Sequence, residues 1–414
     1  MQTFISFEQA LEEVLRSCHV LEPEHVALAE SLGRVLASDI ISSENIPPFA
    51  SSAMDGFAVR HEDLLGCETG AVSLRLIDHI AAGQVSNKTI EPGTCAKIMT
   101  GAPIPPGATA VVPREAVENG TEGPENSPEA IVFRSAIEYG KHVRPAAEDV
   151  RMGDTVLVKG VAITPPMVGM LATLGYDRVP VVRKPRVRVI STGDEIVPPS
   201  WKPGPGQIRN SNGPGLRAQA LCAGASCDQY EHVSDNPEAI RALITGGEPA
   251  DLWVFSGGVS VGDHDYVKAV LEELGMQMVF WKVRQRPGKP LAFGKMGKTL
   301  VLGLPGNPVS SAMCFEVYAR PMIKALLGEG DRTDSPQPMY AELSEAVEKV
   351  KDLHYFARGL LTESENGGRT VVLTGPQGSN LYHSVVKANC IVHLPEGQTH
   401  VPQGAKVRIT PLLW

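Results

Sequence analysis

The chain has 414 residues and a net charge of −9. A chain of this length is too long for one hydrophobic core, so we expect two to four domains. The negative balance argues against a general nucleic-acid binder, although it leaves room for a local basic pocket. Glycine (41 residues) and proline (33 residues) are abundant, which favours many turns and β-rich modules over a helical bundle.

Neither the cysteines nor the N-terminus indicates secretion. The seven cysteines are scattered, without a C-x-x-C pair or a Cys/His cluster, so the sequence predicts neither a disulfide framework nor a zinc site. The first residues, MQTFISFEQALEEVL, lack the basic and apolar regions of a signal peptide, and no run is long enough to span a membrane. We therefore expect a soluble protein of a reducing compartment, the cytoplasm.

The N-terminal stretch is predicted to be helical. Residues 6–17 have the pattern of an amphipathic helix with Ser6 as its cap. The side chains expected to face inward are Ala10, Leu11, Val14 and Leu15. A second helical pattern covers Pro23–Leu36. Residues 42–59 are irregular, and composition alone favours Asp55-Gly56 as a turn before the strand Phe57–Val59.

From residue 70 to 150, short β runs alternate with turn signals, which predicts a small β module. Its last part, residues 142–149, places a histidine and two acids beside a turn. Because β and helical patterns resume over residues 153–182, we expect the module to be an insertion. The predicted domains are an elongated N-terminal unit (residues 1–45 with 150–183) and an inserted β module (residues 46–149).

After Lys184-Pro185, strands alternate with helices as far as residue 330. The expected strands are Val187–Ile190, Asp228–Val233, Leu252–Phe255, Met278–Trp281 and Thr299–Leu302. The expected helices are 210–223, one that starts at Asp235-Asn236-Pro237, one that carries Val267, Val270, Leu271 and Leu274, and Val309–Leu327. This alternation predicts a doubly wound, mostly parallel sheet with helices on both faces, over residues 184–330.

The loop after Leu252–Phe255 is rich in glycine. Ser256–Gly262 breaks the strand, and the helix that follows leaves free backbone N–H groups, where anions bind well. Asp263 and Asp265 would repel a bare phosphate, but they suit a divalent cation between them and the phosphate. The alternative is that they only cap the helix.

Ligands of such sheets bind outside the carboxyl ends of the strands. The residues at those ends are Asp194, Glu195, Asp235, Asp263, Asp265, Arg286, Lys289 and Asn307. An anionic ligand neutralised by Mg²⁺, together with Arg286 and Lys289, accounts for both signs of charge. The sequence lacks the dinucleotide fingerprint, the P-loop and G-x-S-x-G, and Ser260 has no His/Asp partner pattern, which disfavours nucleophilic catalysis. His264 is more typical of a solvent-facing helix start than of a base.

The end of the chain is different in composition. Residues 328–338 have the composition of a linker. Beyond them only β-type runs occur, which suit a barrel or a sandwich. Of the two, we predict that residues 337–414 form a separate C-terminal β barrel.

Six motifs occur in the order SSAMDGFAV, IMTGAPIP, STGDE, SGGVSVGDHDY, RPGKPLAFG and LPGNPVSS. Together they resemble the molybdopterin molybdenumtransferase family, which is related to the gephyrin E domain, and the resemblance covers nearly the whole chain. It implies a molybdopterin-binding fold for the central sheet and an elongated homodimer with active sites at the dimer boundary. It also implies Mg²⁺-dependent insertion of molybdate into adenylylated molybdopterin, with AMP released and molybdenum cofactor formed.

The resemblance also implies roles for single residues. The catalytic acids would be Asp55, Asp149, Glu195, Asp235 and Asp265, and the Mg²⁺ ligands would be Glu195, Asp235 and Asp265. The substrate-binding residues would be Thr100, Ser256, Gly257, Gly258, Ser260, Arg286, Lys289, Pro305, Asn307, Pro308, Arg358 and Ser379. Of these, Arg358 and Ser379 would face molybdate. The family often has lysine where Arg286 stands, and arginine prefers a planar, bidentate partner.

Two other functions fit parts of the same pattern. One is a molybdopterin adenylyltransferase on the same nucleotide-binding domain, which would consume ATP and release pyrophosphate. The other is a non-enzymatic scaffold like gephyrin, which the absence of a long partner-binding tail disfavours. The implied partners are adenylylated molybdopterin, molybdate and a second copy of the chain. The upstream adenylyltransferase and acceptor molybdoenzymes are further implied partners, with neither nucleic acid nor a membrane among them.

Overall fold

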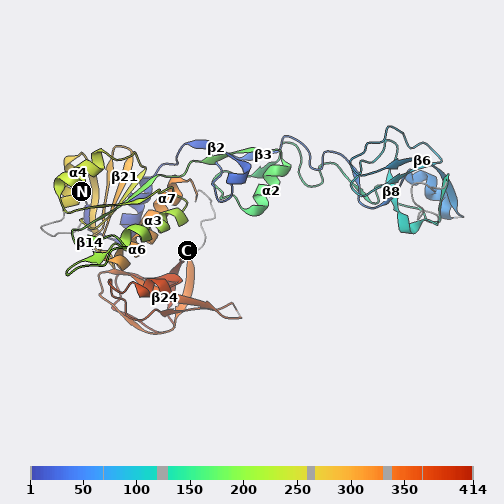
Figure 1. Cartoon of the computed structure of the whole chain (residues 1–414). Coiled ribbons are helices and arrows are strands. Elements are labelled where there is room, and N and C mark those ends of the chain that lie inside the picture. Colours follow the sequence, from blue (N-terminus) through green and yellow to red (C-terminus); the bar gives the residue numbers. More distant parts are fainter. Residues whose placement is uncertain are drawn as a thin grey trace. The chain divides into compact units, whose positions relative to one another are not determined.

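The structure is a computed structural model that describes residues 2–68, 70–118, 129–258, 266–329, 338–365 and 367–412. Figure 1 labels its elements and colours the chain from the N-terminus (blue) to the C-terminus (red). The chain forms two compact units. The larger unit comprises Met1–Ser38, Lys159–Ala172 and Tyr176–Trp414, and the smaller unit comprises Asp39–Val158 with Thr173–Gly175. The predicted insertion, residues 46–149, lies inside the smaller unit, and the finer division into four domains stays a prediction.

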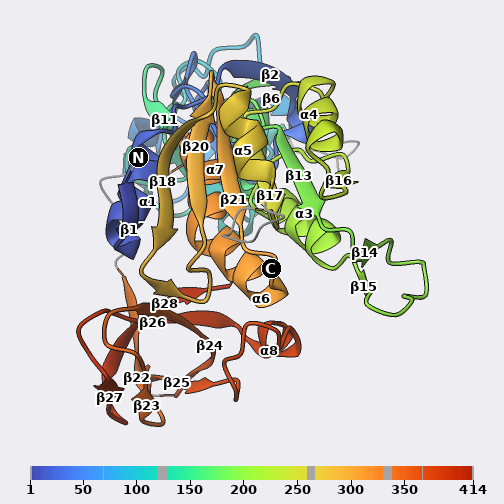
Figure 2. The same ribbon diagram turned by 90° about the vertical axis from the view of Figure 1, so that its left-hand side faces the viewer.

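A seven-stranded sheet is the centre of the larger unit. Its strands, in spatial order, are β1 (Gln2–Ile5), β18 (Gln277–Val283), β20 (Ala292–Met296), β21 (Thr299–Leu304), β17 (Leu252–Ser256), β13 (Val187–Thr192) and β16 (Tyr230–Val233). Figure 2 shows β18 to β16 side by side. β21, β17, β13 and β16 are parallel, and β1 is parallel to β18. Only β20, which no sequence pattern predicted, runs antiparallel to its neighbours. The predicted mostly parallel sheet is confirmed.

Helices cover both faces of this sheet, each through an apolar stripe. The first face is covered by α1 (Phe7–Arg16), α3 (Asn212–Cys222), α6 (Pro308–Cys314) and α7 (Arg320–Leu326), whose buried side chains share one core. The second face is covered by α4 (Pro237–Thr245) and α5 (Tyr266–Glu273), which share another core. A π-helical segment, Phe315–Ala319, joins α6 to α7. Because β18 and the parallel strands point the same way, the loops after them meet at one edge.

Two predictions for the N-terminal stretch are wrong in part. The Ser6 hydroxyl accepts the backbone N–H of Gln9 and caps α1 as predicted, but Leu15 is 38% exposed rather than inward-facing. The region 23–36 contains no α-helix, but strand β2 (Pro23–Ala27) and a 3₁₀ turn (Leu28–Glu30). β2 pairs antiparallel with β12 (Arg178–Val182), so a distant partner in the chain overrides local helical periodicity. The helical pattern predicted within residues 153–182 is confirmed as α2 (Pro165–Thr173).

Five strands of the C-terminal region close into a barrel, as predicted. They are β22 (Met339–Leu343), β24 (His354–Glu363), β25 (Arg369–Leu373), β26 (Cys390–Leu394) and β28 (Lys406–Pro411), and the β24–β26 pairing closes the ring. β23 (Val347–Glu348) pairs with β27 (His400–Val401). The region is not purely β, because a short helix, α8 (His383–Lys387), precedes β26. β19 (Gln285–Arg286), from the loop after β18, pairs parallel with β24.

The smaller unit is a five-stranded sheet with two short extensions. Its spatial order is β8 (Ala110–Pro113), β5 (Gly56–Val59), β7 (Thr94–Ile98), β6 (Val72–Ile80) and β9 (Ala130–Phe133). The extensions pair β4 (Ser51–Ser52) with β10 (Val143–Arg144) and β3 (Ile40–Ile41) with β11 (Thr155–Leu157). The predicted β module is confirmed.

All seven cysteines carry free thiols. Among the described residues, no helix is long and apolar enough to cross a membrane.

Helix α1 packs on the barrel through two buried histidines. The Phe7 ring centroid lies 4.8 Å from that of His354 and 5.0 Å from that of Phe356. His354 Nε2 lies 3.2 Å from His393 Nδ1, and His393 Nε2 lies 2.8 Å from the Thr410 hydroxyl. Burial lowers the pKa of both imidazoles, and the Glu8 carboxylate, 3.5 Å from His354 Nδ1, offsets this only in part.

This pair predicts a loss of stability at mildly acidic pH. Both histidines are neutral when folded, whereas in the unfolded chain they bind protons below pH ~6.5. The contribution of these two histidines to the free energy of unfolding is therefore largest above that pH, and it falls as the pH drops toward their lowered native pKa values. The melting temperature should fall more steeply below pH 6.5 in the natural chain than in His393→Asn. Equal slopes between pH 7.5 and 5 would contradict this.

Candidate functional site

The main cavity lies at the carboxyl edge of the central sheet and has a volume of about 470 Å³. Its lining comes from the ends of β13, β17 and β21, the start of α3 and the loop before α4. The lining residues are Ser191, Thr192, Gly193, Glu195, Ile196, Ile208, Arg209, Asn210, Ser211, Asn212, Asp235, Ser256, Gly257, Gly258, Pro290, Pro305, Gly306, Asn307 and Pro308. Eight of the predicted site residues line this cavity, and they include Glu195, Asp235 and Asn307 from the residues expected at the strand ends. Their roles stay predictions.

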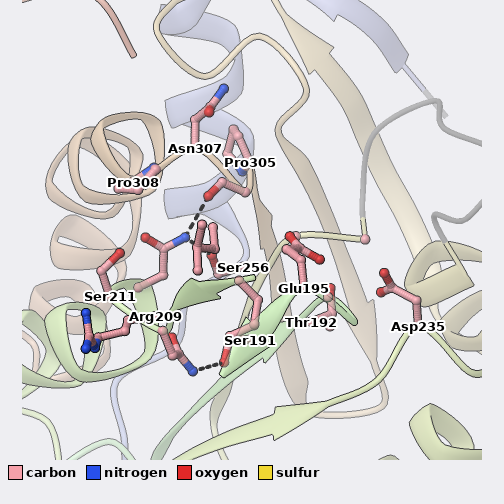
Figure 3. A pocket seen from close by; sticks show the side chains of 18 of the residues that line it. Ser191, Thr192, Glu195, Arg209, Ser211, Asp235, Ser256, Pro305, Asn307 and Pro308 are labelled. Carbon is pink, nitrogen blue, oxygen red and sulfur yellow. Dashed lines mark hydrogen bonds between the residues drawn. The ribbon is translucent and has the colours of Figure 1, made fainter. Parts of the chain in front are cut away.

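Two acids mark one side of this cavity. Figure 3 shows Asp235 on the side away from Pro308 and Asn307, with Glu195 between. Gly193, at φ +141°, leaves room for the Glu195 carboxylate, whose Oε2 would lie 2.6 Å from any Cβ at that position. The Asp194 carboxylate accepts the backbone N–H of Asp235 at 3.1 Å, which ties the loop after β16 to the loop after β13. The two predicted acids are therefore held at one cavity.

The donor chemistry of these acids fits Mg²⁺. In phosphate-transferring sites, Mg²⁺ commonly takes one or two carboxylates and completes its shell with water and substrate phosphates. Glu195 and Asp235 supply two carboxylates beside a cavity large enough for a phosphate ligand. No set of three histidine, cysteine or acidic side chains in the described part of the chain is arranged to hold a metal alone. Asp265, the third predicted ligand, lies outside the described residues, as do Ser260, Asp263 and His264.

The first two glycines of the glycine loop, Gly257 and Gly258, lie against Thr192 at the end of β13. Gly257 and Gly258 have φ values of +98° and +66°. A Cβ on Gly257 would approach the Thr192 hydroxyl to 2.8 Å, and one on Gly258 would approach Val267 Cγ2 to 2.4 Å. At these two positions the backbone can therefore follow this path only without side chains. The Thr192 hydroxyl beneath it is buried and has no hydrogen-bond partner among the described residues.

A second cavity, of about 290 Å³, adjoins the first and carries the predicted cations. It is lined by Gln285, Arg286, Pro287, Gly288, Lys289, Pro290, Pro305, Asn307, Ser310, Leu353, Gln377 and Ser379. Pro290, Pro305 and Asn307 line both cavities and form a common wall. The sequence predicted one pocket for both signs of charge, whereas the structure separates acids and cations into two neighbouring cavities.

The turn that carries the cations is fastened to a buried glutamine. Gln285 is fully buried, and its amide donates to the carbonyl of Gly288 at 3.0 Å and accepts the Tyr318 hydroxyl at 2.6 Å. Gly288 has φ +90°, and a Cβ there would lie 2.2 Å from Cys314 Sγ. Tyr318 and Cys314 belong to the long helix after β21. This helix therefore sets the position of the turn.

Arg286 and Lys289 are held differently. Arg286 Nη1 donates to the Tyr355 hydroxyl at 3.2 Å, and its guanidinium lies 5.4 Å from the centre of the Tyr355 ring. Arg286 and Tyr355 are direct partners in the β19–β24 pairing. Lys289 Nζ lies 5.0 Å from the centre of the Phe4 ring. Both side chains are exposed, so both cations remain accessible to a ligand.

Arg358 differs from the prediction. Its side chain is 1% exposed and donates to the Ser384 hydroxyl and to the carbonyls of residues 376, 377 and 378. It lines neither cavity, so it does not face a ligand there but holds the loop that carries Ser379. Ser379 lines the second cavity, and its carbonyl accepts the backbone N–H of Val309 at 3.3 Å. Burial lowers the pKa of Arg358 to about 10.

The other predicted residues lie in the smaller unit. The Asp55 carboxylate accepts the backbone N–H of Thr100 at 2.7 Å and the Thr100 hydroxyl at 2.8 Å, so these two predicted residues lie together. These two bonds, the backbone one first, hold the pKa of Asp55 below its usual range. Asp149 is exposed, and its backbone N–H donates to the carbonyl of Ile46 at 3.0 Å. Composition alone had favoured a simple turn at Asp55.

Several polar residues of the site were not predicted from the sequence. Thr192 and Asn212 line the main cavity, and Gln285 and Tyr355 hold the turn of the second cavity. Thr192 could have been found as the residue before Gly193 at the end of a predicted strand. The other three owe their role to partners far away in the chain.

Family models match three successive regions of the chain. Residues 5–175 match the MoeA N-terminal region (domain I and II), residues 188–325 a probable molybdopterin binding domain, and residues 340–412 the MoeA C-terminal region (domain IV).

Similar proteins cover the whole length. The molybdopterin molybdenumtransferase of Bacillus subtilis is 36% identical over 410 residues, which are 96% of this chain and 92% of that protein. Molybdopterin molybdenumtransferase 2 of Mycobacterium tuberculosis is 34% identical over 419 residues and all of both chains. The crystal structure of a molybdopterin biosynthesis MoeA protein from Pyrococcus horikoshii has a TM-score of 0.84, with 30% identity over 99% of each chain.

The Asp55–Thr100 contact makes a direct prediction. Thr100→Val removes the hydroxyl donor and leaves the backbone N–H, so the pKa of Asp55 should rise toward its ordinary value. The measurement is a carbon-13 NMR titration of the side-chain carboxyl. Thr109→Val in the same unit, whose hydroxyl bonds to His61 instead, serves as the control. An unchanged Asp55 pKa in Thr100→Val would show that this hydroxyl does not stabilise the charged carboxylate.

Proposed function

The chain belongs to the molybdopterin molybdenumtransferase family, and on this premise we propose that it inserts molybdate into adenylylated molybdopterin, with Mg²⁺ required and AMP released. Membership of the family makes the chain an enzyme of molybdenum cofactor biosynthesis. The finer reaction is supported by one observation above all. A cavity with two acids and a glycine loop adjoins a cavity with two cations, and Pro290, Pro305 and Asn307 form the wall between them.

Two adjoining cavities suit a reaction between two anions. Molybdate and the pyrophosphate of the adenylylated pterin repel each other, by about 1 kcal/mol at 4 Å in water and several times more in a protein interior for each pair of unit charges. Arg286 and Lys289 would bind molybdate in the second cavity, and the glycine loop and the start of α3 would bind the nucleotide end in the main cavity. Each anion then has its own neutralising groups next to the other.

Glu195 and Asp235 would hold Mg²⁺ at the main cavity, with Asp265 as a third ligand. When bound, Mg²⁺ would polarise the phosphoryl oxygens and stabilise the departing AMP. The two dithiolene sulfurs of the pterin would bind molybdenum and displace a molybdate oxygen as water, and a water molecule would attack the phosphoryl group from which AMP departs, so no protein nucleophile is needed. Because the two cavities share a wall, the two substrates would lie next to each other, and the chemistry would be left to them.

The proposal includes the assembly and cellular partners implied by the family. The chain would work as a cytoplasmic homodimer, receive adenylylated molybdopterin from the upstream adenylyltransferase and pass the finished cofactor to molybdoenzymes. Asp55, Thr100 and Asp149 would take part in the reaction of that dimer.

One assay tests the proposed reaction. Purified chain, adenylylated molybdopterin, molybdate and Mg²⁺ are mixed, and nucleotide release is followed by liquid chromatography. We expect AMP to appear with molybdate and not without it. Consumption of ATP with release of pyrophosphate would instead indicate an adenylyltransferase. Absence of any conversion, with a peptide partner bound, would indicate a scaffold.

Lys289 should matter for molybdate in particular. Lys289→Ala removes a cation from the second cavity, and a hydrogen bond to a charged group contributes about 1.5–3 kcal/mol. The molybdate concentration for half-maximal AMP release should therefore rise roughly ten- to hundredfold. Lys298→Ala, in the β20–β21 turn at the opposite edge, should leave it unchanged. An unchanged value in Lys289→Ala would count against the role of the second cavity.

The two acids should set the Mg²⁺ requirement. Glu195→Gln and Asp235→Asn each remove one negative charge from the main cavity. The Mg²⁺ concentration that gives half-maximal AMP release should therefore rise roughly tenfold or more. The control is Asp228→Asn, which lies before β16 at the other end of the sheet. If neither substitution alters the Mg²⁺ dependence, these carboxylates do not hold the cation.

A further inference from the structure

Asn212 stands where three elements of the main cavity meet. It is the first residue of α3, and it lines the cavity. Its side-chain NH₂ donates to the Ser256 hydroxyl at the end of β17 and to the carbonyl of Gly306 after β21, both at 2.8 Å. The Ser311 hydroxyl lies 3.4 Å from the same nitrogen. Figure 3 labels Ser256 among the residues of this pocket.

These bonds determine which way the amide of Asn212 faces. A peptide carbonyl can only accept a hydrogen bond, so the carbonyl of Gly306 requires the NH₂ group on its side. Both hydrogens of that group are used by Ser256 and Gly306. The other end of the amide, Oδ1, must then point away from the ends of β17 and β21.

This oxygen is a hydrogen-bond acceptor without a partner in the described part of the chain. Among the described residues no donor bonds to Asn212 Oδ1, and this atom is not buried, so it is reachable from the cavity that Asn212 lines. Asn210, which lines the same cavity, is different. Its NH₂ donates to the Ser191 hydroxyl at 2.7 Å and its Oδ1 accepts the backbone N–H of Gly213 at 2.9 Å. The amide of Asn210 is bonded within the fold at both ends, whereas that of Asn212 keeps an acceptor for a ligand.

We propose that Asn212 is a specificity-determining residue whose Oδ1 accepts a hydrogen bond from an N–H or O–H group of the substrate. The inference rests on the proposed function, because it takes the occupant of the main cavity to be adenylylated molybdopterin. A phosphate at neutral pH offers acceptors, and the negative end of the amide dipole repels it. The donor is therefore a ring N–H or amino group of the pterin, or a ribose hydroxyl or the adenine amino group of the nucleotide.

The test measures which ligand loses affinity in Asn212→Ala. Dissociation constants of the full chain are measured by calorimetry for molybdopterin, AMP, 2′-deoxy-AMP, 3′-deoxy-AMP and N6,N6-dimethyl-AMP, without turnover. A donor that loses its acceptor weakens binding roughly tenfold. If the donor is on the nucleotide, AMP binds the variant about tenfold more weakly, whereas the analogue that lacks this donor binds both proteins equally. If it is on the pterin, only molybdopterin is affected.

Ser311→Ala is the matched control. It removes the hydroxyl next to the Asn212 NH₂ and leaves Oδ1 in place, so it should change no ligand selectively. An equal loss of affinity for all ligands in Asn212→Ala, or no loss for any, would overturn the proposal, because a residue that only lines the cavity does not distinguish between ligands. Should Asn212→Ala fail to fold, Asn212→Ser and the natural chain are compared with the same ligands. If the ratio of the dissociation constants of Asn212→Ser and the natural chain is the same for every ligand, the proposal is overturned.

The role of Asn212 and the proposed reaction can be disproved independently. Suppose that Asn212→Ala weakens the binding of one ligand selectively, while the natural chain releases no AMP with molybdate. This result would support the role of Asn212 and overturn the proposed reaction. A chain that releases AMP normally but shows no selectivity at Asn212 would overturn only the present inference.

Discussion

At the edge of the central sheet, acidic and basic side chains lie close together without neutralising one another. The arrangement of this edge follows from that constraint. Glu195 and Asp235 line one cavity, Arg286 and Lys289 line the next, and Pro290, Pro305 and Asn307 stand between them. If acids and cations shared one cavity, they would pair with each other and leave little charge for a ligand. The wall keeps each set available.

The wall is rigid because the elements around it are fastened together through buried polar groups. Gln285 links the cation turn to Tyr318 and to Gly288, and β19 adds the same turn to the barrel sheet. Arg358 holds the loop of Ser379 from inside the barrel. The bonds of Gln285 are buried, so leaving a partner of this side chain unpaired would cost about 1–3 kcal/mol. The barrel therefore positions one side of the second cavity.

Sequence reasoning predicted the architecture and the main cavity well, for a physical reason. Parallel strands end at one edge, so a residue after a predicted strand, such as Glu195, Asp235 or Asn307, can be placed there from its position in the chain alone. The glycine loop was recognisable because only glycine tolerates the backbone angles of Gly257 and Gly258. Asp55 and Thr100 received roles only through the resemblance to a family, and the contact between them comes from the structure.

The errors arise where a distant partner decides. β2 looks helical in isolation and becomes a strand by pairing with β12. Arg358 looks like an anion-binding cation, but the carbonyls of residues 376–378 surround it. The separation of cations from acids depends on the β19–β24 pairing, which no local pattern indicates. Asn212 shows the same limit, because its free acceptor is defined by bonds to two other strands' ends.

The central claim is that two anions occupy the two adjoining cavities. Crystals of the protein grown with AMP, Mg²⁺ and molybdate, measured at the molybdenum absorption edge, would locate molybdenum directly. The account predicts an anomalous peak between Arg286, Lys289 and Ser379, with the AMP phosphate on the other side of Pro305 and Asn307. A molybdenum peak in the main cavity, or one remote from both cavities, would contradict it.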